Sequence, residues 1–238
     1  MPSALIVAHG SPADPAPFEA RMAVLAAAVA AHLPGWQVRG ATLAAEGALE
    51  AALAGLDAPI VYPFFMAEGW FTRTTLPRRL REAGHAGLHR LPAFGVAPDL
   101  PRLTARTAIE GAEAAGLPPC ETTLLIAAHG SQVSRASAEG ARAMAALLGH
   151  LAPFRRVLTG FIEEPPHLFQ VARGLGPAIC LPFFALSAGH VLQDVPEALA
   201  TAGFRGPLLP AIGEHPDAAR IIATGLSRHC PGPHHAGL

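Results

Sequence analysis

The sequence predicts an α/β protein built from two tandem repeats of a parallel-sheet, doubly wound βα unit, with a cleft between the repeats. The first observation is an alternation of short apolar runs with longer helix-forming stretches, which is typical of parallel strands covered by helices on both faces. The second is a set of motifs that occurs twice, in the same order, about 120 residues apart. A chain of 238 residues is long enough for two such units, each with its own core.

Four pairs of motifs define the repeat. The second copies are His129-Gly130-Ser131, Pro182-Phe183-Phe184, Gly189, and Pro210-Ala211-Ile212-Gly213 with Pro216-Asp217; the first copies are His9-Gly10-Ser11, Pro63-Phe64-Phe65, Gly69, and Pro92-Ala93-Phe94-Gly95 with Pro98-Asp99. We therefore expect a first repeat over residues 1–117, a second over residues 118–228 and a flexible tail over residues 229–238. The proline-containing stretch Gly116–Cys120 is the expected linker.

The first repeat contains four apolar runs and four helix-forming stretches. We expect strands at Ala4–Ala8, Val38–Leu43, Ile60–Phe65 and Leu88–Leu91. We expect helices at Pro15–Leu33, Glu46–Leu56, Leu76–Ala83 and Asp99–Ala115, with Asp99 as the N-cap of the last one.

The second repeat has the same alternation. We expect strands at Thr122–Ala128, Arg156–Ile162, Ala178–Phe184 and Pro207–Leu209. We expect helices at Ala136–His150, Pro166–Gly174, Val195–Thr201 and Asp217–His229.

The composition excludes several classes of protein. The chain is 51% hydrophobic and 15% charged with a net charge of −1, which suits a compact soluble protein and argues against a nucleic-acid binder. The three cysteines, Cys120, Cys180 and Cys230, contain no CxxC pair, so we expect neither a disulfide framework nor a cysteine-based zinc site, and a cytoplasmic location. The apolar stretch Ala20–Leu33 contains Arg21 and His32, so we interpret it as an amphipathic helix, and we expect no membrane association.

Three candidate metal ligands follow three predicted strands of the second repeat. They are His129, then Glu163 or Glu164, then His190. Because the carboxyl ends of parallel strands meet at one edge of a sheet, these side chains are expected to converge there. Two imidazoles and a carboxylate suit cobalt, iron, nickel or zinc, and a carboxylate beside a metal can accept protons. Taken singly, each residue is also compatible with a purely structural role.

The first repeat lacks a full ligand set. It keeps His9, but Trp70 stands at the position of His190, and Ala44 with Ala45 occupies the region of the two glutamates, with only Glu46 nearby. The second repeat is therefore the predicted catalytic one. Trp70 and Phe71 would offer a flat apolar surface to a planar ligand, with core packing as the alternative.

Several motifs resemble those of one enzyme family. LIAAHGS, FIEEPP, LPFFALSAGH and HVLQDVPEAL are similar to segments of the class II, ATP-independent tetrapyrrole chelatases, in particular the sirohydrochlorin cobaltochelatases and ferrochelatases of the CbiX and SirB type. The resemblance extends over residues 3–228. It implies that His129 and His190 are the catalytic, metal-handling histidines and that Glu163 is their acidic partner, although the short run into Pro165 leaves Glu164 as the alternative.

The resemblance also implies the reaction and its substrates. These are insertion of a divalent metal, cobalt or ferrous iron, into sirohydrochlorin or a related tetrapyrrole, with the metal as substrate and no tightly bound cofactor. The absence of a Walker loop and of GxGxxG agrees with a reaction that needs no ATP. A substrate with many carboxylates needs arginines, and Arg73 and Arg135 are our candidates, whereas a solvated helix face is the alternative for Arg78–Arg81. We expect the substrate site to include Ser131, Arg135, His9, Trp70 and Arg73.

Two other functions remain open at the level of sequence. One is a non-catalytic carrier of a metal or tetrapyrrole, for which the tail histidines His229, His234 and His235 could capture metal. The other is a zinc-dependent hydrolase, against which stands the lack of a further acidic or nucleophilic motif at the strand ends. We expect a monomer or a weak homodimer; the metal and the tetrapyrrole are not determined by the residues.

Overall fold

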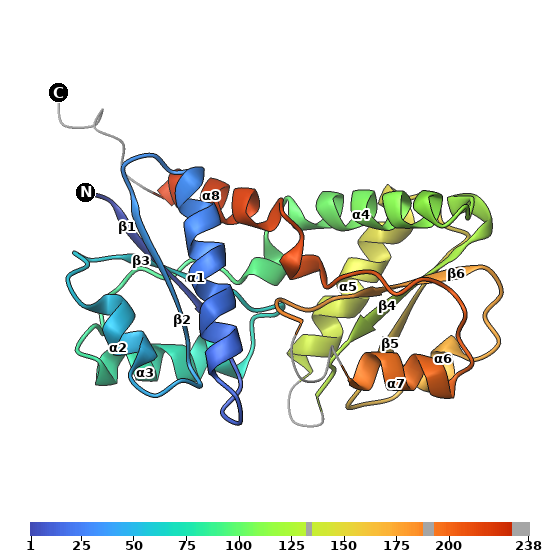
Figure 1. Cartoon of the computed structure of the whole chain (residues 1–238), viewed down its shortest axis with the longest axis horizontal. Coiled ribbons are helices and arrows are strands. Elements are labelled where there is room, and N and C mark those ends of the chain that lie inside the picture. The colour runs from blue at the N-terminus through green and yellow to red at the C-terminus, as the bar shows by residue number, and fades with distance from the viewer. Residues whose placement is uncertain (132–134, 188–192, 230–238) are drawn as a thin grey trace. The chain divides into compact units, whose positions relative to one another are not determined.

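The computed structural model describes residues 1–131, 135–187 and 193–229 (Figure 1). The chain forms two compact units, each assembled from separate segments. Unit 1 consists of Met1–Phe64, Phe71–Ala97 and Ala219–Leu238, and unit 2 consists of Phe65–Trp70 and Pro98–Ala218.

Unit 1 contains a three-stranded parallel sheet with the strand order β2-β1-β3. Its strands are β1 (Ser3–Ala8), β2 (Gln37–Thr42) and β3 (Ile60–Pro63), and its helices are α1 (Ala16–Ala31), α2 (Ala48–Leu53), α3 (Leu76–Glu82) and most of α8 (Ala218–His229). Every residue of the central strand β1 is buried, as its uninterrupted apolar sequence predicts. A π-helical turn, Phe71–Thr75, leads into α3.

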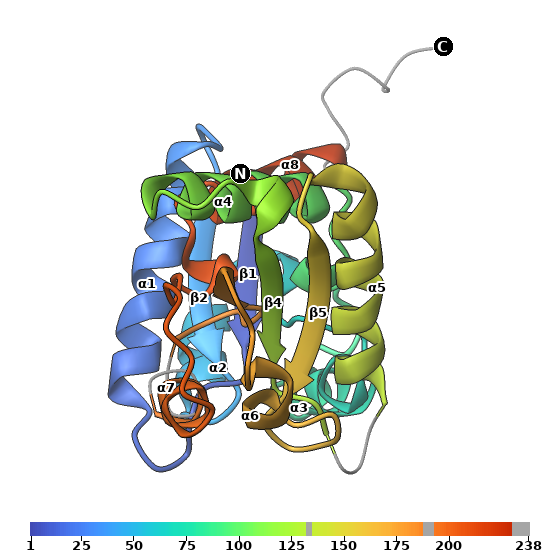
Figure 2. The same cartoon turned by 90° about the vertical axis from the view of Figure 1, so that its right-hand side faces the viewer.

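Unit 2 repeats this arrangement with the strand order β5-β4-β6, again all parallel. Its strands are β4 (Thr123–Ala128), β5 (Arg156–Phe161) and β6 (Ala178–Pro182), and its helices are α4 (Leu100–Ala114), α5 (Ala136–Leu151), α6 (Leu168–Ala172) and α7 (Asp194–Thr201). Figure 2 shows the arrowheads of β4 and β5 at the same end of the sheet, opposite the end crossed by α4. The carboxyl ends of neighbouring strands therefore meet at one edge.

The last helix of each sequence repeat belongs to the compact unit formed mainly by the other repeat. Helix α4 packs against α5 and β6, and a Cβ added to its Gly111 would come within 2.7 Å of the Leu209 side chain. Helix α8, red in Figure 1, lies with the elements of unit 1, where a Cβ on its Gly225 would be 3.1 Å from the Tyr62 ring. Glycine thus permits close packing of both helices.

Two of the predicted strands do not form strands in the structure. Leu88–Leu91 and Pro207–Leu209 each form only a single parallel bridge at the side of a sheet. Proline follows both segments, as Pro92 and Pro210, and has no N–H with which to extend the pairing. The bridges join Val61 to Arg90 and Cys180 to Leu208.

The helices begin and end close to their expected bounds, with one difference in capping. Asp99 stands at the N-cap of α4, as expected, but its side chain makes no capping hydrogen bond. Pro101 in the first turn removes one of the N–H groups that a cap would otherwise satisfy. None of the helices within the described ranges is both long enough and apolar enough to span a membrane.

Candidate functional site

His129 is placed by the end of the buried strand β4. The strand is completely buried up to Ala128, and the half-buried His129 and the glycine that follows it form the turn that leaves the sheet. Nδ1 of His129 lies 3.1 Å from the carbonyl oxygen of Gly130. Because a carbonyl can only accept a hydrogen bond, Nδ1 carries the proton in this contact. In the neutral imidazole the lone pair is then on Nε2, the nitrogen through which a histidine in this tautomer binds a metal.

Glu163 is brought beside His129 by main-chain pairing that continues past the ends of the strands. Ala128 is paired with Phe161 in the β4–β5 register. The N–H of Ile162 then donates to the carbonyl of Ala128 at 3.1 Å, and the N–H of Glu163 donates to the carbonyl of His129 at 2.9 Å. The acid and the histidine, which are distant in sequence, are therefore neighbours at the edge of unit 2.

The adjacent Glu164 is engaged differently. Its Oε1 accepts a hydrogen bond from the backbone N–H of Ser131 at 3.2 Å. Among the residues that the structure describes, the Glu163 carboxylate makes no hydrogen bond or ion pair, and it is half-buried. The two neighbouring acids thus have different surroundings, with Glu164 turned to the main chain of the His129 turn.

The third predicted ligand, His190, lies outside the described residues. Within the described ranges, no group of three or more His, Cys, Asp or Glu side chains could hold a metal ion. The last described residue before His190 is Ser187, which is buried and whose N–H donates to Oε1 of Glu214 at 2.9 Å.

Cys180 is not a candidate ligand. Burial raises the pKa of the Cys180 thiol, so this cysteine stays protonated at neutral pH and is a poor metal ligand.

Unit 1 has the same main-chain geometry without the acid. The N–H of Ala44 donates to the carbonyl of His9 at 3.0 Å, the counterpart of the bond between Glu163 and His129. Ala44 is therefore the structural equivalent of Glu163. The imidazole of His9 packs against the ring of Phe71, with the ring centroids 4.1 Å apart.

The aromatic pair that follows β3 is at the surface. Trp70 is 64% exposed and Phe71 is 37% exposed, so neither is a core residue. The exposed Trp70 ring presents flat apolar surface, whereas the Phe71 ring also packs against His9.

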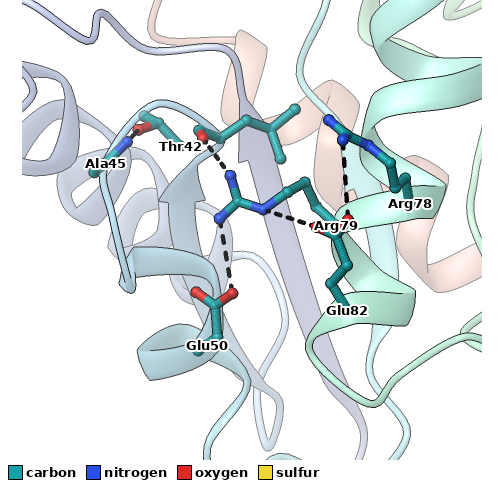
Figure 3. Close-up of polar contacts among 7 residues, drawn as sticks. Thr42, Ala45, Glu50, Arg78, Arg79 and Glu82 are labelled. Atoms are coloured by element: carbon teal, nitrogen blue, oxygen red, sulfur yellow. Dashed lines mark hydrogen bonds and ion pairs between the residues drawn. The ribbon is translucent and has the colours of Figure 1, made fainter.

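Of the arginines of α3, Arg79 makes contacts within unit 1, whereas Arg78 is largely exposed to solvent. Figure 3 shows Arg79 reaching from α3 to the loop after β2, where its Nη1 donates to the carbonyl of Leu43 at 3.0 Å. Its guanidinium also lies 3.7 Å from Glu50 and 3.9 Å from Glu82. Arg79 therefore holds the loop that contains the equivalent of Glu163. Of the two arginines predicted to bind substrate, Arg73 lies in the π-helical turn, Arg135 is at the N-cap of α5, and both are exposed.

Comparison with solved structures decides the family. A structure described as that of CbiX, the terminal enzyme for biosynthesis of siroheme in denitrifying bacteria, is 46% identical to this chain, covers 97% of it and is itself covered completely, with a TM-score of 0.88. This chain belongs to the CbiX family. The family is that of the class II sirohydrochlorin chelatases, as the sequence motifs predicted.

More distant structures share the fold alone. SirB from Bacillus subtilis, solved with Fe³⁺, is 17% identical over 96% of this chain and 95% of its own, with a TM-score of 0.73. DR2241 from Deinococcus radiodurans, a multi-domain protein with structural similarity to chelatases, is 23% identical, with a TM-score of 0.69; this chain covers 54% of it. No curated protein matches the sequence.

The CbiX family model matches residues 123–229. This range begins at β4 and ends at the last residue of α8, so it contains His129, Glu163 and His190. The part of the chain most like the family model is thus the part with the complete predicted ligand set.

Sequence reasoning did not predict that, in unit 2, the carboxylates of Glu164 and Glu214 bind backbone N–H groups. For Glu214, the duplicated motifs contained a signal that would have singled it out. The motif Pro210–Gly213 repeats Pro92–Gly95, and the next residue is Glu214 in one repeat but Val96 in the other.

The turn after β4 requires glycine for two reasons, which gives a test of stability. Gly130 has φ +72°, and a Cβ there would lie 2.9 Å from Cγ of Glu164. Gly174, also in unit 2, has φ +68° but no heavy atom within 4 Å of an added Cβ. We expect Gly174→Ala to lower the free energy of unfolding by about 1–2 kcal/mol, the cost of the left-handed backbone, and Gly130→Ala to lower it by more.

Urea unfolding of both variants measures this difference. Equal losses in the two variants would show that Glu164 does not pack against the turn as the structure has it.

Proposed function

We propose that this protein inserts Co²⁺ or Fe²⁺ into sirohydrochlorin without ATP, and that His129, Glu163 and His190 of the second repeat are the residues that handle the metal. The observation that supports these residues is the main-chain bond from the Glu163 N–H to the His129 carbonyl, which places an acidic residue next to a histidine whose Nδ1 is held by the Gly130 carbonyl. Unit 1, with Ala44 at the same place, offers no such pair.

The chemistry requires a metal ligand and a proton acceptor. The divalent ion loses part of its water shell, enters the macrocycle and replaces two pyrrole N–H protons, so that two protons are released for each ion inserted. His129 and His190 would hold the partly dehydrated ion on one face of the ring. Glu163 would accept a pyrrole proton, because its carboxylate is not engaged by other described residues.

The proposed substrate site uses charge and flat apolar surface. Sirohydrochlorin carries several carboxylates, and exposed guanidinium groups such as those of Arg135 and Arg73 can bind them with paired hydrogen bonds. Ser131, beside the His129 turn, adds a hydroxyl group. The exposed ring of Trp70 and the imidazole of His9 would contact the macrocycle.

The arginine part of this proposal has its own test. We expect Arg135→Ala to raise KM for sirohydrochlorin roughly tenfold with little change in kcat, because a charge-assisted hydrogen bond to a carboxylate contributes about 1.5 kcal/mol or more. Arg78→Ala is the matched control, since the Arg78 side chain is 59% exposed and is paired only weakly with Glu82 at 3.9 Å. An unchanged KM in Arg135→Ala would remove this residue from the substrate site.

The test of the function is turnover followed by absorbance. Purified protein is mixed with sirohydrochlorin and either Co²⁺ or Fe²⁺ under anaerobic conditions, and the spectrum is compared with the spontaneous reaction. We expect a clear acceleration with at least one of the two metals. Binding of metal or macrocycle without any acceleration would instead support a carrier.

A cytoplasmic site of action is part of the proposal. It is supported by the three cysteines, none of which forms a CxxC pair.

A further inference from the structure

Two carboxylates in unit 2 bind backbone N–H groups close in sequence to the two proposed metal-handling histidines. Glu164 accepts from the N–H of Ser131 at 3.2 Å, two residues after His129. Glu214 accepts from the N–H of Ser187 at 2.9 Å, three residues before His190 in the sequence. Each bond joins a glutamate from elsewhere in the unit to the main chain of a histidine-bearing segment.

Glu164 is packed tightly against the His129 turn. A Cβ built on Gly130 would lie 2.9 Å from Cγ of Glu164 and 3.0 Å from its Oε1. The side chain therefore covers the glycine and then turns to the N–H of the next residue. Together with the bond between the Glu163 N–H and the His129 carbonyl, this ties the turn to the loop after β5 at two points.

The residue before Glu214, Gly213, packs closely against the segment after β6. Glu214 ends the short 3₁₀ turn Ile212–Glu214. The N–H of Gly213 donates to the carbonyl of Phe184 at 2.9 Å, and a Cβ on Gly213 would come within 2.1 Å of the Ala185 carbonyl oxygen. The backbone that carries Glu214 is thus fixed in place, and its carboxylate reaches a buried serine N–H.

The first repeat shows what the site looks like without these carboxylates. Ala45, which follows the equivalent of Glu163, takes the place of Glu164, and Val96 takes the place of Glu214. In unit 1 the glycine of the turn, Gly10, packs against Thr42, the counterpart of Phe161 beside Gly130, with no glutamate among its nearest neighbours. The repeat that lacks the second histidine and the acid therefore also lacks both of these glutamates, and a different carboxylate, that of Glu19 on α1, accepts from the N–H of Thr42 at 2.8 Å there.

We propose that Glu164 and Glu214 are positioning residues for the chelatase reaction: Glu164 fixes the turn that carries His129, and Glu214 fixes the main chain at Ser187, three residues before His190 in the sequence. This rests on the proposed role of the two histidines. Neither glutamate is a ligand in this proposal; each acts through a backbone N–H. Groups that orient metal ligands typically change metal affinity by about 10–100-fold when they are replaced.

The experiment distinguishes the effect of side-chain length from the effect of the negative charge at Glu164 and Glu214. At each position, Glu→Asp keeps the negative charge but shortens the side chain by one methylene, whereas Glu→Gln keeps the length and an acceptor oxygen but removes the charge. Glu121→Ala, at an exposed position of unit 2, is the control. The measurements are the Kd for Co²⁺ by titration calorimetry, KM for Co²⁺ and for sirohydrochlorin, kcat and Tm.

We expect Glu164→Asp and Glu214→Asp to weaken Co²⁺ binding roughly tenfold, with an unchanged KM for sirohydrochlorin. We expect both Gln variants to stay close to wild type in Co²⁺ affinity, since the amide oxygen still accepts the N–H bond. The double Asp variant should show a larger loss than either single variant, because each glutamate holds a different segment.

The reverse pattern, in which Gln weakens Co²⁺ binding and Asp does not, would show that the carboxylates act through their charge and would overturn this inference. A lowered Tm with unchanged Co²⁺ affinity in both Asp variants would overturn it as well, leaving only a structural role. In both cases wild-type metallation would stand. A wild-type protein that neither binds Co²⁺ nor accelerates metallation would instead overturn the proposed function, and this inference with it.

Discussion

Replacing His129 by alanine is expected to lower kcat/KM for cobalt insertion by at least about 100-fold, since even groups that only orient a metal ligand cost about 10–100-fold. The residue removed would be a direct ligand whose Nε2 is set up for the metal by the contact between Nδ1 and the Gly130 carbonyl. The fold should survive, because His129 is only half-buried and lies in the turn beyond the buried residues of β4. Initial rates from the sirohydrochlorin spectrum, with Co²⁺ varied, measure the loss.

The matched control for this variant is His9→Ala. His9 follows β1 as His129 follows β4, but it packs on Phe71 and has Ala44, not a glutamate, beside it. We expect a much smaller loss of activity, confined to substrate binding. His190→Ala should behave like His129→Ala. If His9→Ala proved the more damaging variant, the catalytic site would have to be assigned to the first repeat.

Replacing Glu163 by glutamine is expected to lower kcat for metallation by about 100-fold, the lower end of the range for a lost general base. Glutamine keeps the length of the side chain and the main-chain bond to the His129 carbonyl, so the site should remain assembled. What it removes is the ability to accept a pyrrole proton. Single-turnover absorbance measurements at saturating Co²⁺ separate this step from metal binding.

Comparison with Glu164→Gln makes this prediction specific. The two glutamates are adjacent, but Glu164 is engaged with the Ser131 N–H, which glutamine can still satisfy. We therefore expect a large fall in kcat for Glu163→Gln and a small one for Glu164→Gln. The opposite ranking would make Glu164 the acid that takes part in the reaction.

The fold could be predicted to a large extent because its signals are local. The buried strand β4 is an uninterrupted apolar run, and duplicated motifs such as His9-Gly10-Ser11 disclosed the two repeats. The exchange of α4 and α8 between compact units could not be predicted in the same way. An amphipathic pattern shows that one face of a helix is buried, but not which sheet buries it.

By itself, the sequence determined that His129 and an acid would meet at the carboxyl edge of a parallel sheet, because the ends of neighbouring parallel strands always lie together. Only the tertiary structure decided how the two adjacent acids differ: the main chain of Glu163 is bonded to that of His129, while the bare backbone of Gly130 leaves room for the Glu164 side chain to turn toward the Ser131 N–H. The directions of consecutive side chains in a turn depend on backbone angles and on what packs against them. Those are properties of the assembled unit and not of the residue types.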